Sequence, residues 1–88
     1  MSWQLEIGAG AQKQLRKLDP ALAARIVRAI IRDLGRHGDP RAFGEPMVGN
    51  RLGFWRYRIG DYRAICRIED AVVTVHVVHV AHRREVYR

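Results

Sequence analysis

A two-residue break, Gly60-Asp61, separates two runs of alternating side chains, Phe54–Ile59 and Tyr62–Ile68. Glycine followed by aspartate between two such runs is typical of a tight β-hairpin. Because the residues of a strand alternate between its two faces, the hairpin determines which side chains share a surface. A valine-rich run, Val72–Ala81, follows an acidic turn. We therefore expect three consecutive antiparallel strands in the second half of the chain.

The first half of the chain has a different periodicity. Trp3, Leu5 and Ile7 alternate with polar residues, as in a half-buried strand. A short amphipathic segment, Ala11 to Leu18, and a longer one, Pro20 to Leu34, follow as helices, with Gly35 as the expected stop. The order β-α-α-β-β-β predicts an α+β fold in which a two-helix hairpin packs on one face of a small, antiparallel-rich sheet.

The length limits the organisation of the chain. Its 88 residues allow one domain, residues 1–88, and no apolar run approaches the ~18–20 residues needed to cross a bilayer. We expect no membrane partner and a cytoplasmic protein, because no signal peptide is recognisable and the single cysteine, Cys66, rules out a disulfide framework.

The charge is strongly basic. Sixteen lysines and arginines stand against nine acidic residues, a net charge of +7, and only Lys13 and Lys17 are lysines. Arginine binds phosphate through a planar, forked guanidinium. A small, arginine-rich, cationic domain is therefore expected to bind a polyanion such as nucleic acid, or an acidic protein, although a merely soluble basic protein has the same charge.

Alternation brings several arginines together on the predicted sheet. Arg56 and Arg58 share one face, Arg63 lies on the neighbouring strand, and Arg83 follows the last strand. We interpret these four as a phosphate-binding surface, and the following as further RNA contacts: Arg51, Arg84 and Arg88. Arg67 and the arginines of the second helix fit ordinary solvated surfaces, so they stay outside this site.

Other chemistries have little support in the sequence. His76, His79 and His82 are spaced by three, so strict alternation places His79 on the face opposite the other two, which argues against a metal site. Cys66 lies in the middle of an apolar strand, and carboxylates are sparse on the predicted arginine surface. We therefore expect no metal site.

At this point a family resemblance is visible. The segments Trp55-Arg56-Tyr57-Arg58, Gly60-Asp61-Tyr62-Arg63 and Val80-Ala81-His82-Arg83-Arg84-Glu85-Val86-Tyr87 resemble the RelE-type toxins of the RelE/ParE superfamily of bacterial toxin–antitoxin systems. The likeness covers nearly the whole chain. It implies a RelE-like fold and an endoribonuclease that needs no metal and no organic cofactor. Such an mRNA interferase cuts messenger RNA in the ribosomal A site, inhibits translation and arrests growth.

The resemblance also implies roles for individual residues. Arg63 and Arg83 match arginines that stabilise the scissile phosphate, and Tyr87 matches a catalytic or base-stacking tyrosine. Arg56 and Arg58 stand where the family pattern has two lysines, one of them proposed as the base. Because arginine stays protonated, either another group accepts the proton or the reaction relies mainly on substrate positioning by the ribosome. His82 is the only titratable candidate near the predicted arginine surface. The register between Arg83 and Arg84 stays open.

The family further implies partners and alternatives. The expected partners are a cognate antitoxin with an acidic, extended segment, the ribosome and messenger RNA, and promoter DNA bound through the antitoxin. One alternative is a ParE-like inhibitor of DNA gyrase on the same fold, which needs no arginine cluster. Another is a non-catalytic relative that binds only RNA or the antitoxin.

Overall fold

The computed structural model describes residues 2–86, so Tyr87 and Arg88 lie outside the described part of the chain. The strands are β1 (Gln4–Ile7), β2 (Glu45–Pro46), β3 (Trp55–Ile59), β4 (Tyr62–Glu69) and β5 (Thr74–His82). The helices are α1 (Ala9–Arg16), α2 (Pro20–His37) and a short α3 (Arg83–Val86). Three 3₁₀ turns complete the chain: η1 (Pro40–Phe43), η2 (Gly49–Arg51) and η3 (Asp70–Val72).

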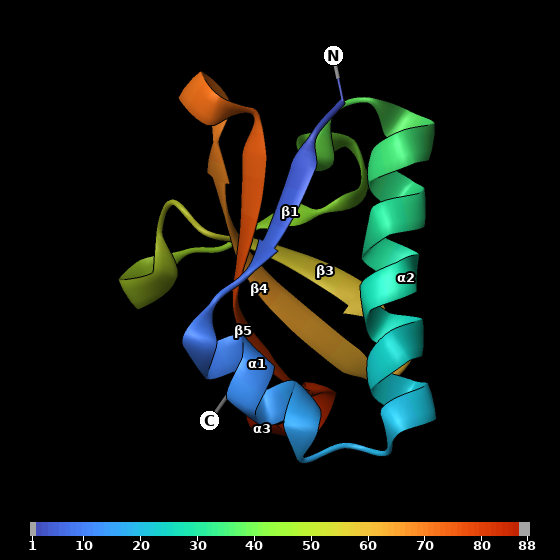
Figure 1. Cartoon of the computed structure of the whole chain (residues 1–88). Coiled ribbons are helices and arrows are strands. Elements are labelled where there is room, and N and C mark those ends of the chain that lie inside the picture. Colours follow the sequence, from blue (N-terminus) through green and yellow to red (C-terminus); the bar gives the residue numbers. More distant parts are fainter. Residues whose placement is uncertain (1, 87–88) are drawn as a thin grey trace.

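The five strands form one mixed sheet in the order β1-β5-β4-β3-β2 (Figure 1). The meander β3–β4–β5 is antiparallel, and its first turn is the predicted Gly60-Asp61 hairpin, where Gly60 has a φ of 58°. β1 pairs with β5 in parallel, which places the N-terminal strand at one edge of the sheet. The predicted α+β fold and element order are confirmed.

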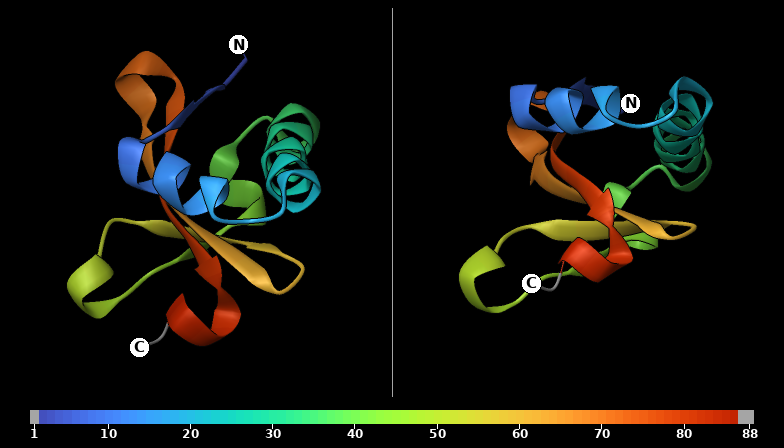
Figure 2. Two further views of the ribbon diagram at one scale, coloured as in Figure 1. Left: turned by 60° about the horizontal axis from the view of Figure 1, so that its bottom comes forward. Right: turned by 90° about the horizontal axis from the view of Figure 1, so that it is seen from below.

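Both long helices lie on the same side of the sheet (Figure 2). Ile26 and Ile30 of α2 are buried against residues of β3, β4 and β5, among them Tyr57 and Ala64. α1 follows β1 and runs beside the second half of β5, to which β1 does not extend. The helix pair therefore covers one sheet face and leaves the opposite face without a helical layer.

The boundaries of α2 follow its capping residues. Asp19 accepts a hydrogen bond from the backbone N–H of Ala21 at 2.8 Å and so caps the start of the helix. The helix ends at His37, three residues beyond the expected end at Leu34, because Gly38 rather than Gly35 adopts the left-handed conformation, with a φ of 70°. The indole Nε1 of Trp3 donates to the carbonyl oxygen of Gly38 at 2.9 Å and ties this end to β1.

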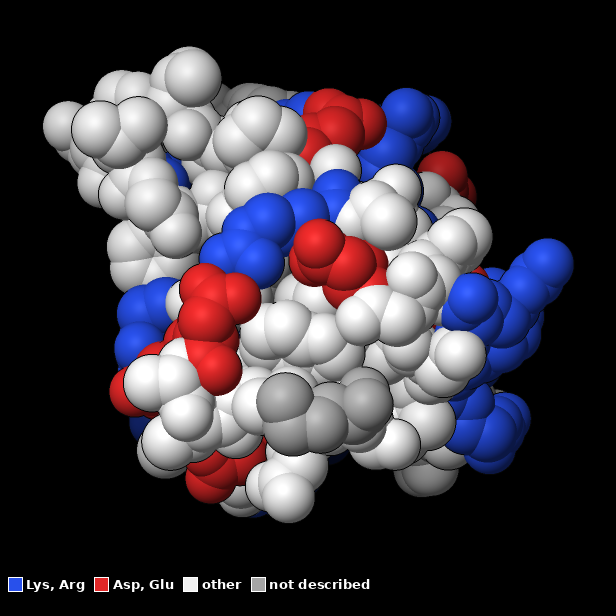
Figure 3. Space-filling view, turned by 90° about the horizontal axis from the view of Figure 1, so that it is seen from above, with Lys and Arg blue, Asp and Glu red and all other residues white. Residues whose placement is uncertain are grey.

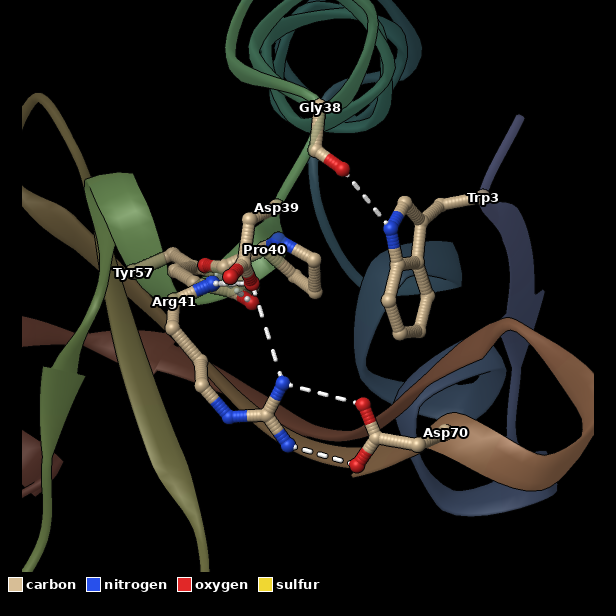
Figure 4. Close-up of polar contacts among 7 residues, drawn as sticks. All are labelled: Trp3, Gly38, Asp39, Pro40, Arg41, Tyr57 and Asp70. Carbon is tan, nitrogen blue, oxygen red and sulfur yellow. Dashed lines mark hydrogen bonds and ion pairs between the residues drawn. The ribbon is translucent and has the colours of Figure 1, made fainter. Parts of the chain in front are cut away.

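The segment between α2 and β3 is ordered by polar contacts (Figure 4). The buried hydroxyl of Tyr57 donates to the carbonyl oxygen of Pro40 at 3.0 Å. Arg41 binds both carboxylate oxygens of Asp70, at 3.0 and 2.7 Å, and so connects η1 to the turn between β4 and β5. These contacts fix the chain just before β2, which pairs with β3 as an edge strand that the sequence did not predict.

A β-bulge in β5 changes the faces of its histidines. Ile65 lies opposite His79, but Cys66 lies opposite Val77, so Val78 is an extra residue without a partner on β4. His76 and His79 consequently share a face, and His82 lies on the other. The prediction from strict alternation, which separated His79 from both other histidines, is wrong for His76 because it assumed a regular strand.

Within residues 2–86, no helix is both long and apolar enough to span a lipid bilayer.

Candidate nucleic-acid interface

The sheet surface away from the helices carries four arginines, one of which is Arg67. We call the other three the arginine face: Arg56, Arg58 and Arg63. Their neighbours along the strands, such as Tyr57 and Ala64, point into the core beneath α2, so the arginines point outward. The register places Arg58 opposite Arg63, and Arg63 opposite Ala81 of β5. The register therefore places these three arginines on the same face of the sheet, as the alternation predicted.

Arg63 is the most constrained member of this group. Its residue is only 6% exposed, and its Nη1 donates to the carbonyl oxygens of Gly60 and Tyr62 at 3.0 and 2.9 Å. Its Nε has no hydrogen-bond partner among the described residues. A surface position was expected for this arginine, and that expectation is wrong, because the guanidinium folds back onto the hairpin turn. The donors of Arg63 are therefore held in fixed directions.

An acidic residue that the sequence analysis did not predict at this site contacts the arginine face. Glu45 of β2 lies opposite Arg56 and forms a hydrogen-bonded ion pair with it. This hydrogen bond and the charge of Arg56 lower the pKa of Glu45, and the charges of Arg58 and Arg63 lower it further. Glu45 partly neutralises Arg56, so the uncompensated positive charge is concentrated at the Arg58–Arg63 pair.

Arg83 lies at the same end of the sheet as the hairpin turn. Its backbone N–H donates to the carbonyl oxygen of Asp61 at 2.7 Å, and its Nε lies 3.8 Å from a carboxylate oxygen of the same aspartate. The Arg83 side chain is 54% exposed, so its guanidinium remains accessible to an anion. Arg84 is also exposed, at the start of α3.

Arg51 is the one other predicted RNA contact that the structure describes. Arg51 lies in η2 and is partly buried; its charge acts on His79 of β5. Tyr87 and Arg88 fall outside the described residues, so their predicted roles have no structural test.

His82 does not share the arginine face. It lies opposite Tyr62, with the ring centroids 5.4 Å apart and the rings nearly perpendicular, on the side where Tyr62 packs against the helical core. Its Nδ1 accepts a hydrogen bond from the backbone N–H of Arg84 at 3.2 Å. The expectation that His82 lies near the arginine surface is therefore wrong, and His79 is the histidine whose register places it there.

The site is suited to binding phosphate and not to metal or thiolate chemistry. Among residues 2–86, no three histidine, cysteine or acidic side chains are grouped closely enough to hold a metal ion. Cys66 is fully buried, and this burial strongly raises the pKa of its thiol, which stays protonated. Fixed guanidinium donors around an open sheet surface can bind a phosphate and stabilise negative charge that develops on it.

The predicted exclusion of the α2 arginines from the site agrees with their location. Figure 3 shows basic side chains along the side of the molecule where α2 lies, away from the sheet. Arg25, Arg28 and Arg32 lie on the exposed surface of this helix.

Comparison with known proteins identifies the family to which this fold belongs. The family model described as the ParE toxin of type II toxin–antitoxin systems (parDE) matches residues 5–87. The chain therefore belongs to this toxin family, within the RelE/ParE superfamily.

Its individual relatives are RelE-type toxins. The chain is 33% identical over 88 residues to the toxin RelG of Mycobacterium tuberculosis. This alignment covers 100% of this chain and 99% of RelG. Its structure is similar to the RelBE2 toxin–antitoxin complex of the same organism, with a TM-score of 0.83, 31% identity, and coverage of 94% of this chain and 100% of the other. A free mutant of the Escherichia coli toxin RelE has the same fold, with a TM-score of 0.72, 21% identity, and coverage of 99% and 92%.

Proposed function

We propose that this toxin is a metal-independent endoribonuclease that cleaves messenger RNA in the ribosomal A site and so inhibits translation. The observation that carries the proposal is the pairing of Arg58 with Arg63 across β3 and β4. Two like charges directly opposite each other destabilise a sheet unless an anion lies between them. In the proposed function, a phosphate group of the RNA substrate is this anion.

The proposed reaction transfers the scissile phosphoryl group to the neighbouring ribose 2′-oxygen. The 2′-OH attacks phosphorus, the bond to the 5′-oxygen breaks, and the products are a cyclic phosphate and a free 5′-OH. Arg58, Arg63 and Arg83 bind the phosphate and stabilise the additional negative charge of the transition state. Arg56, paired with Glu45, positions the RNA backbone. Tyr87 is proposed to stack on a base.

The proton of the 2′-OH needs an acceptor that is not an arginine, because a guanidinium remains protonated at neutral pH. On the ribosome, an RNA group or water can take this role, and the toxin then contributes orientation and charge stabilisation. This division of roles between ribosome and toxin fits a site whose described basic residues are almost all arginines.

An antitoxin is the proposed protein partner. The solved relative from M. tuberculosis is itself a toxin–antitoxin complex. A net charge of +7 favours rapid association with an acidic segment that covers the arginine face, and such binding would block access of RNA. Binding of the complex to promoter DNA would then occur through the antitoxin.

Inhibition of DNA gyrase is the second candidate, because the matching family model is that of ParE toxins. The two candidates predict different products. Purified toxin is added to a translating extract, and messenger 5′ ends are mapped by primer extension, beside a gyrase supercoiling assay. Cuts in codon register that disappear when ribosomes are removed support the proposal. Intact message together with blocked supercoiling would replace it with the gyrase function.

A further inference from the structure

A pocket lies at the end of β5 that is closest to α3. Its volume is about 350 Å³, and it is bounded by α1, β5 and α3. This volume is at the lower end of the range for small-ligand sites, roughly 300–1,000 Å³. We refer to it as the edge pocket. The residues that matter for its chemistry are Gln14, Lys17, Tyr62, His79, His82 and Glu85.

We propose that the edge pocket binds a nucleobase of the RNA and prefers bases that carry an exocyclic amino group. This inference rests on the proposed function and names a recognition site distinct from the arginine face. Single-stranded RNA is recognised through bases that stack on aromatic rings and form hydrogen bonds along their edges. The edge pocket provides both kinds of contact.

Aromatic surface is provided by Tyr62 and His82. Their rings meet edge to face, with centroids 5.4 Å apart, and both line the pocket. One ring therefore supports the other while leaving aromatic surface for a planar ligand. Neither ring belongs to the arginine face, so the phosphate-binding arginines leave this surface free for a base.

The hydrogen-bonding state of His79 is fixed by Gln14. The Oε1 of Gln14 accepts from the backbone N–H of Val80 at 2.6 Å. The amide nitrogen of Gln14 must then face His79, and it lies 2.8 Å from Nδ1. Since the amide nitrogen is a donor, Nδ1 is the acceptor, and the proton of the neutral ring is on Nε2. His79 thus offers a hydrogen-bond donor.

Burial and the charge of Arg51 lower the pKa of His79, which favours the neutral ring that this geometry requires.

Glu85 provides the complementary acceptor. Its carboxylate lines the same pocket, and its charge acts on His79. Cytosine and adenine each carry an amino donor beside a ring-nitrogen acceptor, which matches a carboxylate beside an imidazole N–H. Uracil presents a carbonyl oxygen where cytosine has its amino group, and a carbonyl facing a carboxylate is disfavoured. Lys17, also at the pocket, can bind the phosphate attached to the base.

Two residues that line the edge pocket are sequence neighbours of proposed phosphate-binding arginines. Tyr62 directly precedes Arg63, and His82 directly precedes Arg83. Because successive residues of a strand point to opposite faces, Tyr62 and Arg63 of β4 place a ring on one side and an arginine on the other. An RNA strand held by its phosphate at Arg63 can therefore turn around the end of the sheet and insert a neighbouring base.

The test uses the full chain, labelled with ¹⁵N and free of ribosomes, in titrations with cytidine monophosphate, uridine monophosphate and ribose 5-phosphate followed by NMR. Cytidine monophosphate is expected to shift the signals of the Gln14 side chain, the Val80 amide and the His79 ring. Uridine monophosphate is expected to bind about tenfold more weakly, the order of one hydrogen bond to a charged group. Ribose 5-phosphate is expected to shift residues of the arginine face and Lys17, but not the Gln14 side chain or the His79 ring.

Variants assign the selectivity to single groups. Glu85→Ala should remove the preference for cytidine over uridine, and Lys17→Ala should weaken both nucleotides by about two- to fivefold, as for an exposed ion pair. Lys13→Ala, an exposed lysine of α1 outside the pocket, is the matched control and should change neither.

Equal affinity for the two nucleotides, or shifts confined to the arginine face, would overturn the inference. Because no ribosome is present, this result is independent of cleavage. A toxin that fails to cut message can still show base-selective binding, and an active nuclease without it would refute only the edge pocket.

Discussion

Arg58 on β3 and Arg63 on β4 lie directly opposite each other on the open face of the sheet. The two arginines are held very differently, since Arg58 is exposed whereas Arg63 is buried and donates to two carbonyl oxygens of its own hairpin. The same substitution should therefore have different consequences at the two positions.

Arg58→Ala is expected to abolish most of the cleavage activity without loss of stability. Removing one of two opposed like charges should leave the free energy of unfolding unchanged or raise it by up to about 0.5–1 kcal/mol. Loss of one charge-stabilising donor should lower the cleavage rate by about 10²-fold or more. Urea unfolding and primer extension measure the two effects, and full activity in this variant would refute the assignment of Arg58 to the site.

Arg63→Ala is expected to lower both activity and stability. It leaves the carbonyl oxygens of Gly60 and Tyr62 without their donor, a loss of about 1–3 kcal/mol in the free energy of unfolding. Growth assays on this variant must therefore be read beside its unfolding curve. Arg67→Ala, on the same strand but exposed, is the matched control and should leave both quantities within about 0.5 kcal/mol and twofold of the wild type.

Glu45→Gln should alter the pH dependence of stability. Arg56 lowers the pKa of Glu45 in the folded state, so this carboxylate stabilises the fold above its unfolded pKa of about 4.3. The stabilisation is lost as the pH falls from that value towards the lower folded pKa. Melting temperatures measured across this acidic range should decline less steeply in Glu45→Gln than in the wild type, and identical curves would contradict the proposed ion pair.

Two glycines offer a paired test of packing. A Cβ at Gly44 would lie 2.3 Å from a ring carbon of Tyr57, which is buried and hydrogen-bonded to Pro40, so Gly44→Ala should destabilise the protein by about 1–3 kcal/mol. A Cβ at Gly35, within α2, meets nothing within 4 Å. Gly35→Ala should therefore stabilise the helix by about 0.5–1 kcal/mol. Thermal unfolding of both variants distinguishes the two environments.

At the pH where an unperturbed histidine is half protonated, the His79 ring should be more than half neutral, because burial and Arg51 lower its pKa. Long-range ¹H–¹⁵N spectra are expected to show the proton on Nε2. Substituting Gln14→Leu removes the donor to Nδ1 and should allow both tautomers. A proton on Nδ1 in the wild-type protein would contradict the orientation of Gln14.

Much of the fold could be predicted from local signals. The Gly60-Asp61 turn and the alternation around it determined which arginines share a face, and Asp19-Pro20 marked the start of α2. These features depend on residues close in sequence, where turn and capping preferences act directly.

The features that the sequence did not predict depend on distant contacts. The bulge at Val78 is visible only when β4 and β5 are aligned, and it reverses the face predicted for the residues beyond it. The pairing of Glu45 with Arg56 requires β2 to reach the sheet, and β2 is only two residues long. The burial of Arg63 follows from a side-chain conformation that periodicity does not encode.

The contact between Arg41 and Asp70 links the segment carrying Glu45 to the far turn of the sheet. Both partners are at least partly exposed, so dissolved ions weaken their attraction, as they weaken the attraction between RNA phosphates and the arginine face. Ionic strength therefore acts on this toxin twice. It reduces the affinity for the polyanion and loosens the strand that orients Arg56, so dilute buffer favours the ordered, binding-competent surface.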